Sequence, residues 1–178
     1  EADLSRALRK LGLNKVSGAD GVSNEFLLAL KSPVTQCMVQ AFNAFLMGDQ
    51  WPHSWAQAVV ALLPKTSTPA AWKHFRPIAL LSSVRKLFAR CIMIKMQPWM
   101  KMKAGQIAQA GGQIMDAVVT LMAIKEKVKL WKMPAVVLQL DCAKAFDSVR
   151  WDTLANTMQH FQVPSPYSLA LMRLVLEQ

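Results

Sequence analysis

Apolar residues recur every three or four positions along most of the chain, which is the spacing of one helix face. Ser23, and either Ser82 or Ser83, stand before such stretches, where a serine hydroxyl can cap a helix. Pro33 suits a first helical turn, and Gly48 ends the stretch that follows it. These patterns predict helices over residues 3–11, 24–30, 33–47, 83–99, 113–131, 151–161 and 165–178.

Three short apolar runs have instead the length and the residue types of β-strands. Residues 56–63 and 75–80, joined by a polar turn, predict a hairpin, in which Pro77 suits an edge strand better than a central one. A third run, 135–141, predicts a buried strand with Asp141 at its end. Many helices with a few short strands indicate an α+β fold.

The predicted helix over residues 113–131 has an apolar side and a charged side. We expect the apolar side to face the protein interior, because burial of such a stripe is what stabilises most helices. Its interior positions would be Ile114, Ala117, Val118, Leu121 and Val128. Residues 101–112, just before this helix, show no period and are expected to be irregular.

Composition and charge change this picture in two respects. Hydrophobic residues make up 53% of the 178 positions and charged residues 18%, which suggests surface that something else normally covers. The formal net charge of +10 favours a polyanionic partner such as nucleic acid.

No apolar run approaches the roughly 20 residues of a membrane helix, so no membrane partner is expected. The chain begins at Glu1 without methionine, and we expect it to be a piece of a longer protein.

The residues that commonly bind metals or act as nucleophiles are scattered. They are Cys37, Cys91, Cys142, His53, His74 and His160. Neither set has the spacing of metal ligands, and the odd number of cysteines does not form a disulfide framework. Free cysteines fit a reducing intracellular setting, the nucleus or the cytoplasm. A histidine-based metal site or a Ser/His/Asp triad is not supported.

Five short motifs follow one another in a specific order. They are Gly18-Ala19-Asp20-Gly21-Val22 with Asn24-Glu25-Phe26-Leu27; Trp55; Leu63-Pro64-Lys65; Phe75-Arg76-Pro77-Ile78-Ala79-Leu80-Leu81 with Lys86-Leu87; and Leu140-Asp141-Cys142-Ala143-Lys144-Ala145-Phe146-Asp147-Ser148-Val149. Each motif is weak alone, but their order and spacing together are specific. On these motifs the chain resembles the reverse transcriptase domain of non-LTR (LINE-type) retrotransposons, and more distantly that of group II introns.

The resemblance implies an RNA-directed DNA polymerase with the right-hand polymerase fold. Residues 1–134 would form the fingers and the helices between fingers and palm, and residues 135–178 would begin the palm. The partners would be an RNA template, a DNA primer and a dNTP, with two Mg²⁺ ions as cofactors. In the family an Asp-Asp hairpin and a thumb follow, which would lie beyond Gln178. We therefore expect the chain alone to be inactive.

The last motif would carry the catalytic chemistry. The resemblance implies that Asp141 is the first catalytic aspartate and a metal ligand, because Mg²⁺ prefers hard oxygen ligands. The backbone carbonyl of Cys142 would add a ligand, and Phe146 would lie under the sugar of the incoming nucleotide. The alternatives are a capping or turn aspartate for Asp141 and a core residue for Phe146. Asp147 is more readily explained as a turn cap than as a second metal ligand.

The hairpin and the helix after it would carry cationic contacts. The resemblance implies that Lys65 and Arg76 bind the triphosphate of the incoming dNTP, as a point charge and a bidentate donor respectively. Two solvated charges beside strands are the alternative. Arg85 and Lys86 would contact the template or phosphates, or would simply lie on a solvated helix face.

The segment before the predicted helix 113–131 departs from the family pattern of Gln-x-Gly-Phe followed by Gly-Arg. The aromatic residue and the arginine are absent, and either Gln106 or Gln109 corresponds to the family glutamine. We take Gln109 as the candidate nucleic-acid contact. Two other functions remain open: a degenerate, non-catalytic retroelement relic that binds nucleic acid by charge, and a helical protein-interaction domain.

Overall fold

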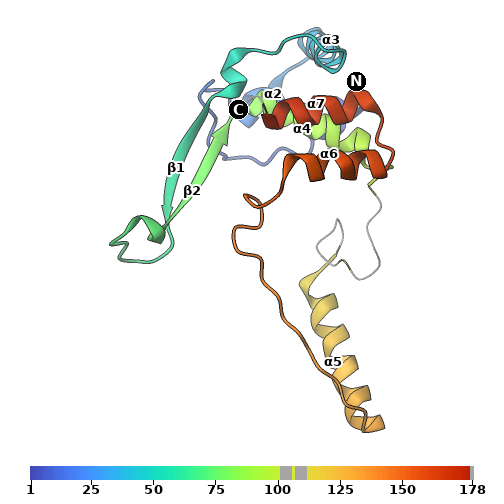
Figure 1. Cartoon of the computed structure of the whole chain (residues 1–178). Coiled ribbons are helices and arrows are strands. Elements are labelled where there is room, and N and C mark those ends of the chain that lie inside the picture. The colour runs from blue at the N-terminus through green and yellow to red at the C-terminus, as the bar shows by residue number, and fades with distance from the viewer. Residues whose placement is uncertain (101–105, 107–111, 177–178) are drawn as a thin grey trace. The chain divides into compact units, whose positions relative to one another are not determined.

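The computed structural model describes residues 1–100, 106 and 112–176. Figure 1 shows helices and one β-hairpin, which confirms the predicted α+β class. The helices are α1 (Ala2–Leu8), α2 (Asn24–Ala29), α3 (Val34–Leu46), α4 (Ser83–Met96), α5 (Ile114–Trp131), α6 (Trp151–His160) and α7 (Ser165–Leu176), with short 3-10 turns at His53–Ala56 and Trp72–His74. The strands are β1 (Ala58–Pro64) and β2 (Phe75–Leu81).

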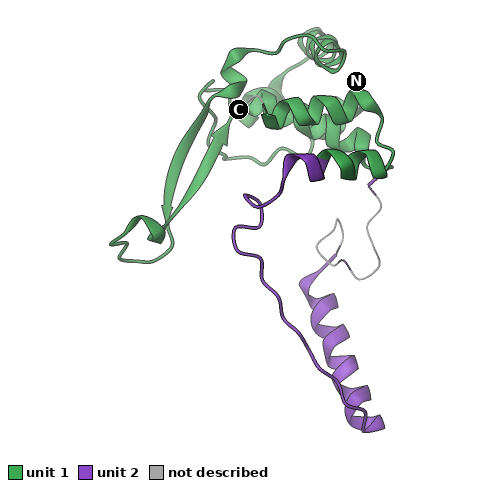
Figure 2. Cartoon of the chain, in the orientation of Figure 1, with its two compact units in different colours: residues 1–99, 155–178 green, residues 100–154 purple. Residues whose placement is uncertain are grey.

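The chain divides into two units (Figure 2). Unit 1 contains residues 1–99 and 155–178, and unit 2 contains residues 100–154. The predicted assignment of residues 1–134 to fingers and 135–178 to palm concerns function, and these units do not test it.

Unit 1 holds the hydrophobic core, with α4 at its centre. The α4 side chains Leu87, Phe88 and Ile92 are each almost completely buried, and α4 packs against α1 and α7. Aromatic rings from other segments surround Phe88 at centroid distances between 5.0 and 6.2 Å, namely Phe42, Phe45, Trp51 and Trp55. Each fully buried large apolar side chain contributes about 1.5–3 kcal/mol to stability. The aromatic cluster therefore ties α3 and the segment before β1 to α4.

Serine caps set two of the helix starts as the sequence predicts. The Ser23 hydroxyl accepts a hydrogen bond from the backbone N–H of Phe26 at 3.1 Å, at the start of α2. The Ser82 hydroxyl accepts one from the N–H of Arg85 at 3.2 Å, so Ser82, and not Ser83, caps α4. Each bond satisfies a backbone donor that the first helical turn leaves free.

The predicted hairpin is also confirmed. β1 and β2 pair antiparallel, from Ala58 opposite Leu81 to Pro64 opposite Phe75. Each strand of this two-stranded sheet is an edge strand, which is where Pro77 is tolerated. Along the described strands no residue is buried, so the hairpin projects from the helices of its own unit with both faces accessible (Figure 1).

The prediction of a buried strand over residues 135–141 is wrong. This segment has neither helix nor strand, and its side chains are exposed, with Val136 at 95%. A strand needs a neighbour to satisfy its backbone N–H and C=O groups. Within residues 1–100, 106 and 112–176 the sheet consists of β1 and β2, which pair with each other, so no described strand pairs with this run.

The predicted helix before that segment is confirmed, but its predicted burial is wrong. α5 begins after Gln113, whose backbone N–H donates to Asp116 Oδ2 at 2.9 Å in a capping box. Over the described range of α5 no residue is buried, and Ile114 is 83% exposed. Apolar spacing indicates which side of a helix can be covered, whereas burial also requires a surface that covers it.

Candidate nucleotide and nucleic-acid site

Lys65 and Arg76 lie on the same face of the hairpin. Arg76 is directly opposite Leu63, and the backbone N–H of Lys65 donates to the carbonyl of His74 at 2.7 Å, which continues the ladder one residue past β1. Because side chains alternate along a strand, Lys65 shares a face with Leu63 and therefore with Arg76. Diagonal neighbours of this kind are about 7–8 Å apart, within reach of long side chains.

Both of these cations are exposed and carry donors for an anion. Lys65 Nζ donates one hydrogen bond, to the Lys73 carbonyl at 3.2 Å, out of the three that an ammonium can make. His74 is held by the turn itself, because its Nδ1 accepts from the backbone N–H of Ala70 at 3.1 Å. The end of the hairpin therefore presents two positive charges on one face, an arrangement that suits a polyphosphate.

Arg85 is placed differently from either expectation. It is 4% exposed, and its guanidinium donates to the Trp55 carbonyl at 2.7 Å and to the Leu174 carbonyl. Burial lowers the pKa of this guanidinium. A solvated helix face is thus wrong for Arg85, which links α4 to α7 and to the residues before β1.

The other predicted nucleic-acid contacts are accessible only in part. Lys86 is half-buried on α4, and its contact with nucleic acid stays a prediction. Gln109 lies outside the described residues, whereas Gln106 is described and exposed.

The predicted catalytic residues lie in unit 2, on an exposed stretch. Asp141 and Cys142 are exposed, and a turn over residues 143–148 follows them. Phe146 within this turn is 94% exposed, so the core alternative is wrong for it in this structure. Asp147 belongs to the same turn, and its capping role stays a prediction.

The parts of the chain that the structure describes contain no cluster of metal-binding side chains. No group of three or more His, Cys, Asp or Glu side chains there could hold a metal ion. Asp141 can therefore supply one carboxylate, and the described residues by themselves do not fit a two-metal site.

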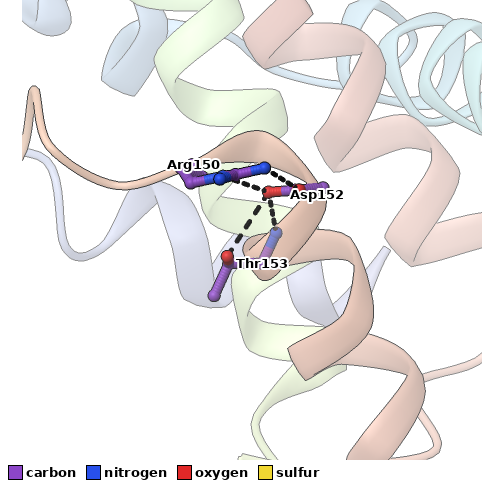
Figure 3. Close-up of polar contacts among 3 residues, drawn as sticks. All are labelled: Arg150, Asp152 and Thr153. Carbon is purple, nitrogen blue, oxygen red and sulfur yellow. Dashed lines mark hydrogen bonds and ion pairs between the residues drawn. The ribbon is translucent and has the colours of Figure 1, made fainter.

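A second carboxylate near Asp141 in sequence is already engaged at the start of α6. Asp152 pairs with Arg150, with Arg150 Nη2 at 2.6 Å from Asp152 Oδ2 (Figure 3). The backbone N–H of Thr153 also donates to Asp152 Oδ1 at 2.7 Å. The Arg150 hydrogen bond, followed by the Thr153 one, lowers the pKa of Asp152. This exposed pair supports the start of a helix and does not form part of a metal cluster.

Asp20 makes a contact at the base of the hairpin that the sequence did not predict. Its Oδ2 accepts a hydrogen bond from the Ser82 hydroxyl at 2.5 Å, and its Oδ1 accepts from the Val22 N–H at 3.3 Å. Two residues earlier, a Cβ on Gly18 would lie 2.5 Å from the Leu81 carbonyl carbon, so only glycine fits. Gly21 has a φ of +67°, which favours glycine as well. The signal in the sequence is the Gly-x-Asp-Gly spacing, which belongs to the first of the five motifs.

In the described parts, no helix is long and apolar enough to cross a membrane.

Comparison with known proteins agrees with the order of the motifs. Residues 63–177, more than half of the chain, match the family model described as reverse transcriptase (RNA-dependent DNA polymerase). Over 89% of the chain it is 28% identical to the transposon TX1 uncharacterized 149 kDa protein of Xenopus laevis, and covers 12% of that protein.

Two Drosophila melanogaster proteins match about half of the chain. Over 51% of the chain, identity is 33% to the probable RNA-directed DNA polymerase from transposon BS and 29% to the RNA-directed DNA polymerase from mobile element jockey. The chain covers 10% of each, so it spans about a tenth of the length of these relatives. The chain belongs to the reverse transcriptase family, in its non-LTR retrotransposon type.

Proposed function

We propose that, in the complete protein, the β1–β2 hairpin binds the triphosphate of an incoming dNTP during RNA-directed DNA synthesis. The observation that carries this proposal is the exposure of Lys65 and Arg76 on one face at the end of the hairpin. Arg76 can give a phosphate two parallel N–H donors, and Lys65 adds a mobile point charge.

The proposed partners are an RNA template, a DNA primer and a dNTP. The net charge of +10 supports a polyanionic partner, because neutralising phosphates releases condensed counterions. Lys86 and Gln109 are the proposed contacts to nucleic acid. Arg85 is not among them, since its donors bind two backbone carbonyls inside the protein.

Nucleotidyl transfer in this family generally uses divalent metal ions. We propose two Mg²⁺ ions in the complete protein, with Asp141 and the backbone carbonyl of Cys142 each supplying one ligand. The remaining carboxylates would come from outside the described residues. The exposed ring of Phe146 would face the sugar of the nucleotide, where its volume would exclude a 2′-hydroxyl.

The test is titration of the chain into a fluorescent dNTP with Mg²⁺, followed by anisotropy. Lys65→Ala and Arg76→Ala should each weaken binding about tenfold, or about 1.4 kcal/mol, since each removes a charged phosphate donor. Lys31→Ala is the matched control, because Lys31 is an exposed lysine of the same unit outside the hairpin. Equal affinities for all three variants would overturn the proposed triphosphate site.

The metal assignment has its own test in the complete polymerase. Asp141→Asn keeps the size of the side chain and removes its charge, so primer extension with Mg²⁺ should be lost. Extension at the unchanged rate would remove Asp141 from the catalytic set.

A further inference from the structure

Both ends of the β1–β2 hairpin meet the first turn of α4. Trp55 lies just before β1, and Ser82 directly follows β2 and caps α4. Each of these two residues is bonded to a charged side chain from elsewhere in unit 1: Trp55 to Arg85, and Ser82 to Asp20.

The entry to the hairpin is held from inside the core. Arg85 donates to the Trp55 carbonyl at 2.7 Å, and the second arm of the same guanidinium donates to the Leu174 carbonyl on α7. The Trp55 ring lies 5.6 Å from Phe88, centroid to centroid, and is buried. Arg85 belongs to α4 and also binds α7. The chain entering β1 is therefore attached to two helices of the core.

The exit from the hairpin is held by the loop around Asp20. Gly18 brings its backbone against Leu81 and Ser82 so closely that a Cβ would lie 2.6 Å from the Ser82 nitrogen. The Ser82 hydroxyl donates to Asp20 at 2.5 Å while it accepts from the N–H of Arg85 at 3.2 Å. One serine thus joins the end of β2, the Asp20 loop and the start of α4.

Between these two anchors the strands contain no buried residue. A hairpin without a packed face gains its direction from its base alone, and one anchor would leave it free to turn about that point. We infer that Asp20 and Arg85 act together as positioning residues that fix the direction in which the hairpin extends from α4. The consequence for ligand binding, that Lys65 and Arg76 are presented at a constant place, rests on the proposed function.

The inference is testable by distance measurement between two nitroxide labels in unit 1. One label occupies Cys37, which is exposed on α3, and the other is introduced with Thr68→Cys at the tip of the hairpin. Cys91→Ser and Cys142→Ser remove the other thiols. α3 is a suitable reference because Phe42 packs 5.0 Å from Phe88 of α4, between ring centroids.

Pulsed electron–electron double resonance should show one narrow distance peak for the doubly labelled chain without further substitutions. Asp20→Ala should lose this peak to a broad distribution, with circular dichroism unchanged, because the exit anchor is removed while the core stays intact. Asp20→Asn should restore the narrow peak, since an amide oxygen can still accept from the Ser82 hydroxyl. Arg85→Lys should broaden it, because one ammonium cannot replace a planar fork.

Asp3→Ala is the matched control. It removes a carboxylate that pairs with Lys95 at 2.9 Å, near the other end of α4, and should leave the peak narrow. A narrow peak in both Asp20→Ala and Arg85→Lys would overturn the inference. Equal broadening in the Asp3→Ala control would overturn it too, because the effect would then reflect general loss of stability.

The distance readout needs no ligand, so it separates this inference from the proposed function. Broad distances in Asp20→Ala, with dNTP affinity unaffected by Lys65→Ala and Arg76→Ala, would support the positioning role and contradict the triphosphate site. Weak dNTP binding in Lys65→Ala, with narrow distances in Asp20→Ala and Arg85→Lys, would do the reverse.

Discussion

Two apolar runs of similar sequence have different structures in units 1 and 2. Residues 58–64 form β1, paired along their whole length with β2, whereas residues 135–141 form no strand. Both runs are rich in valine and leucine, and both are largely exposed. The difference is the partner: a turn of ten residues, 65–74, joins β1 to β2, which pairs with it, whereas no strand among the described residues pairs with residues 135–141.

The two longest helices repeat this contrast. α4 buries six residues against its neighbours, and α5 buries none over its described range, although α5 is the more apolar of the two. Apolar sequence is therefore not what separates the units. Unit 1 brings helices from both ends of the chain around α4, while α5 is not covered by elements of unit 2.

Limited proteolysis should show the largest difference between the units. Trypsin is expected to cut early after Lys144 and Arg150 of unit 2, and likewise after Lys31 and Lys65 in the loops of unit 1, because these residues are exposed outside helices and strands and cleavage there requires no unfolding. Cleavage after the buried Arg85 requires opening of the core, and should be slower by about a thousandfold or more. Mass spectrometry of the early fragments is the measurement. First cuts within α4 would contradict the contrast between the units.

Core truncations should give the next largest difference. Phe88→Ala should lower the free energy of unfolding by about 3–5 kcal/mol, because Phe88 is 1% exposed and touches the aromatic cluster. Leu121→Ala on α5 should change it by about 0.5 kcal/mol or less, as expected of an exposed position. Urea denaturation followed by tryptophan fluorescence compares them. A large loss in Leu121→Ala would show that α5 is covered in solution.

The third prediction, with a smaller expected effect, compares the partly buried Cys91 with the exposed Cys37 and Cys142. Burial, followed by the charge of Asp3, raises the pKa of the Cys91 thiol from 9.0 to about 11. Cys91 should therefore react with Ellman's reagent more slowly than the exposed Cys37 and Cys142.

The raised pKa of Cys91 also makes the stability of the protein depend on pH. The unfolded thiol ionises first as pH rises, so this contribution is present below pH 9 and is lost between pH 9 and about 11. Cys91→Ala should flatten the loss of stability across that interval, and Cys142→Ala serves as the exposed control. An identical pH dependence in Cys91→Ala and the unchanged chain would contradict the burial of this thiol.

Within unit 1, the smallest expected effect belongs to the Asp3–Lys95 pair on its surface. Asp3 raises the pKa of Lys95, by its hydrogen bond first and its charge second. Stability from this pair is thus present below pH 10.5 and is lost as pH rises through the raised value. Because both side chains are partly exposed, Asp3→Asn should cost about 0.2–1 kcal/mol at pH 7, measured by urea denaturation. A cost above that of Phe88→Ala would reverse the order.

Local chemistry made part of this fold predictable. Ser23 and Ser82 cap the helices that follow them, and the polar turn between two apolar runs produces the hairpin, because each depends on residues a few positions apart. The order of the motifs also indicated the reverse transcriptase family. The catalytic role of Asp141 stays a prediction, since metal ligands gather through contacts that no single segment contains.

The pattern of residues along the chain predicted the helices and the hairpin, the cations that flank this hairpin, and the family to which the chain belongs. The folded chain alone puts Lys65 and Arg76 on one face, because that depends on strand register. It also decided that Arg85 turns inward to Trp55 and Leu174, and that Asp20 meets Ser82 across 62 positions of the chain. The physical reason is that periodicity shows which side of an element can be covered, and only the arrangement of distant segments supplies what covers it.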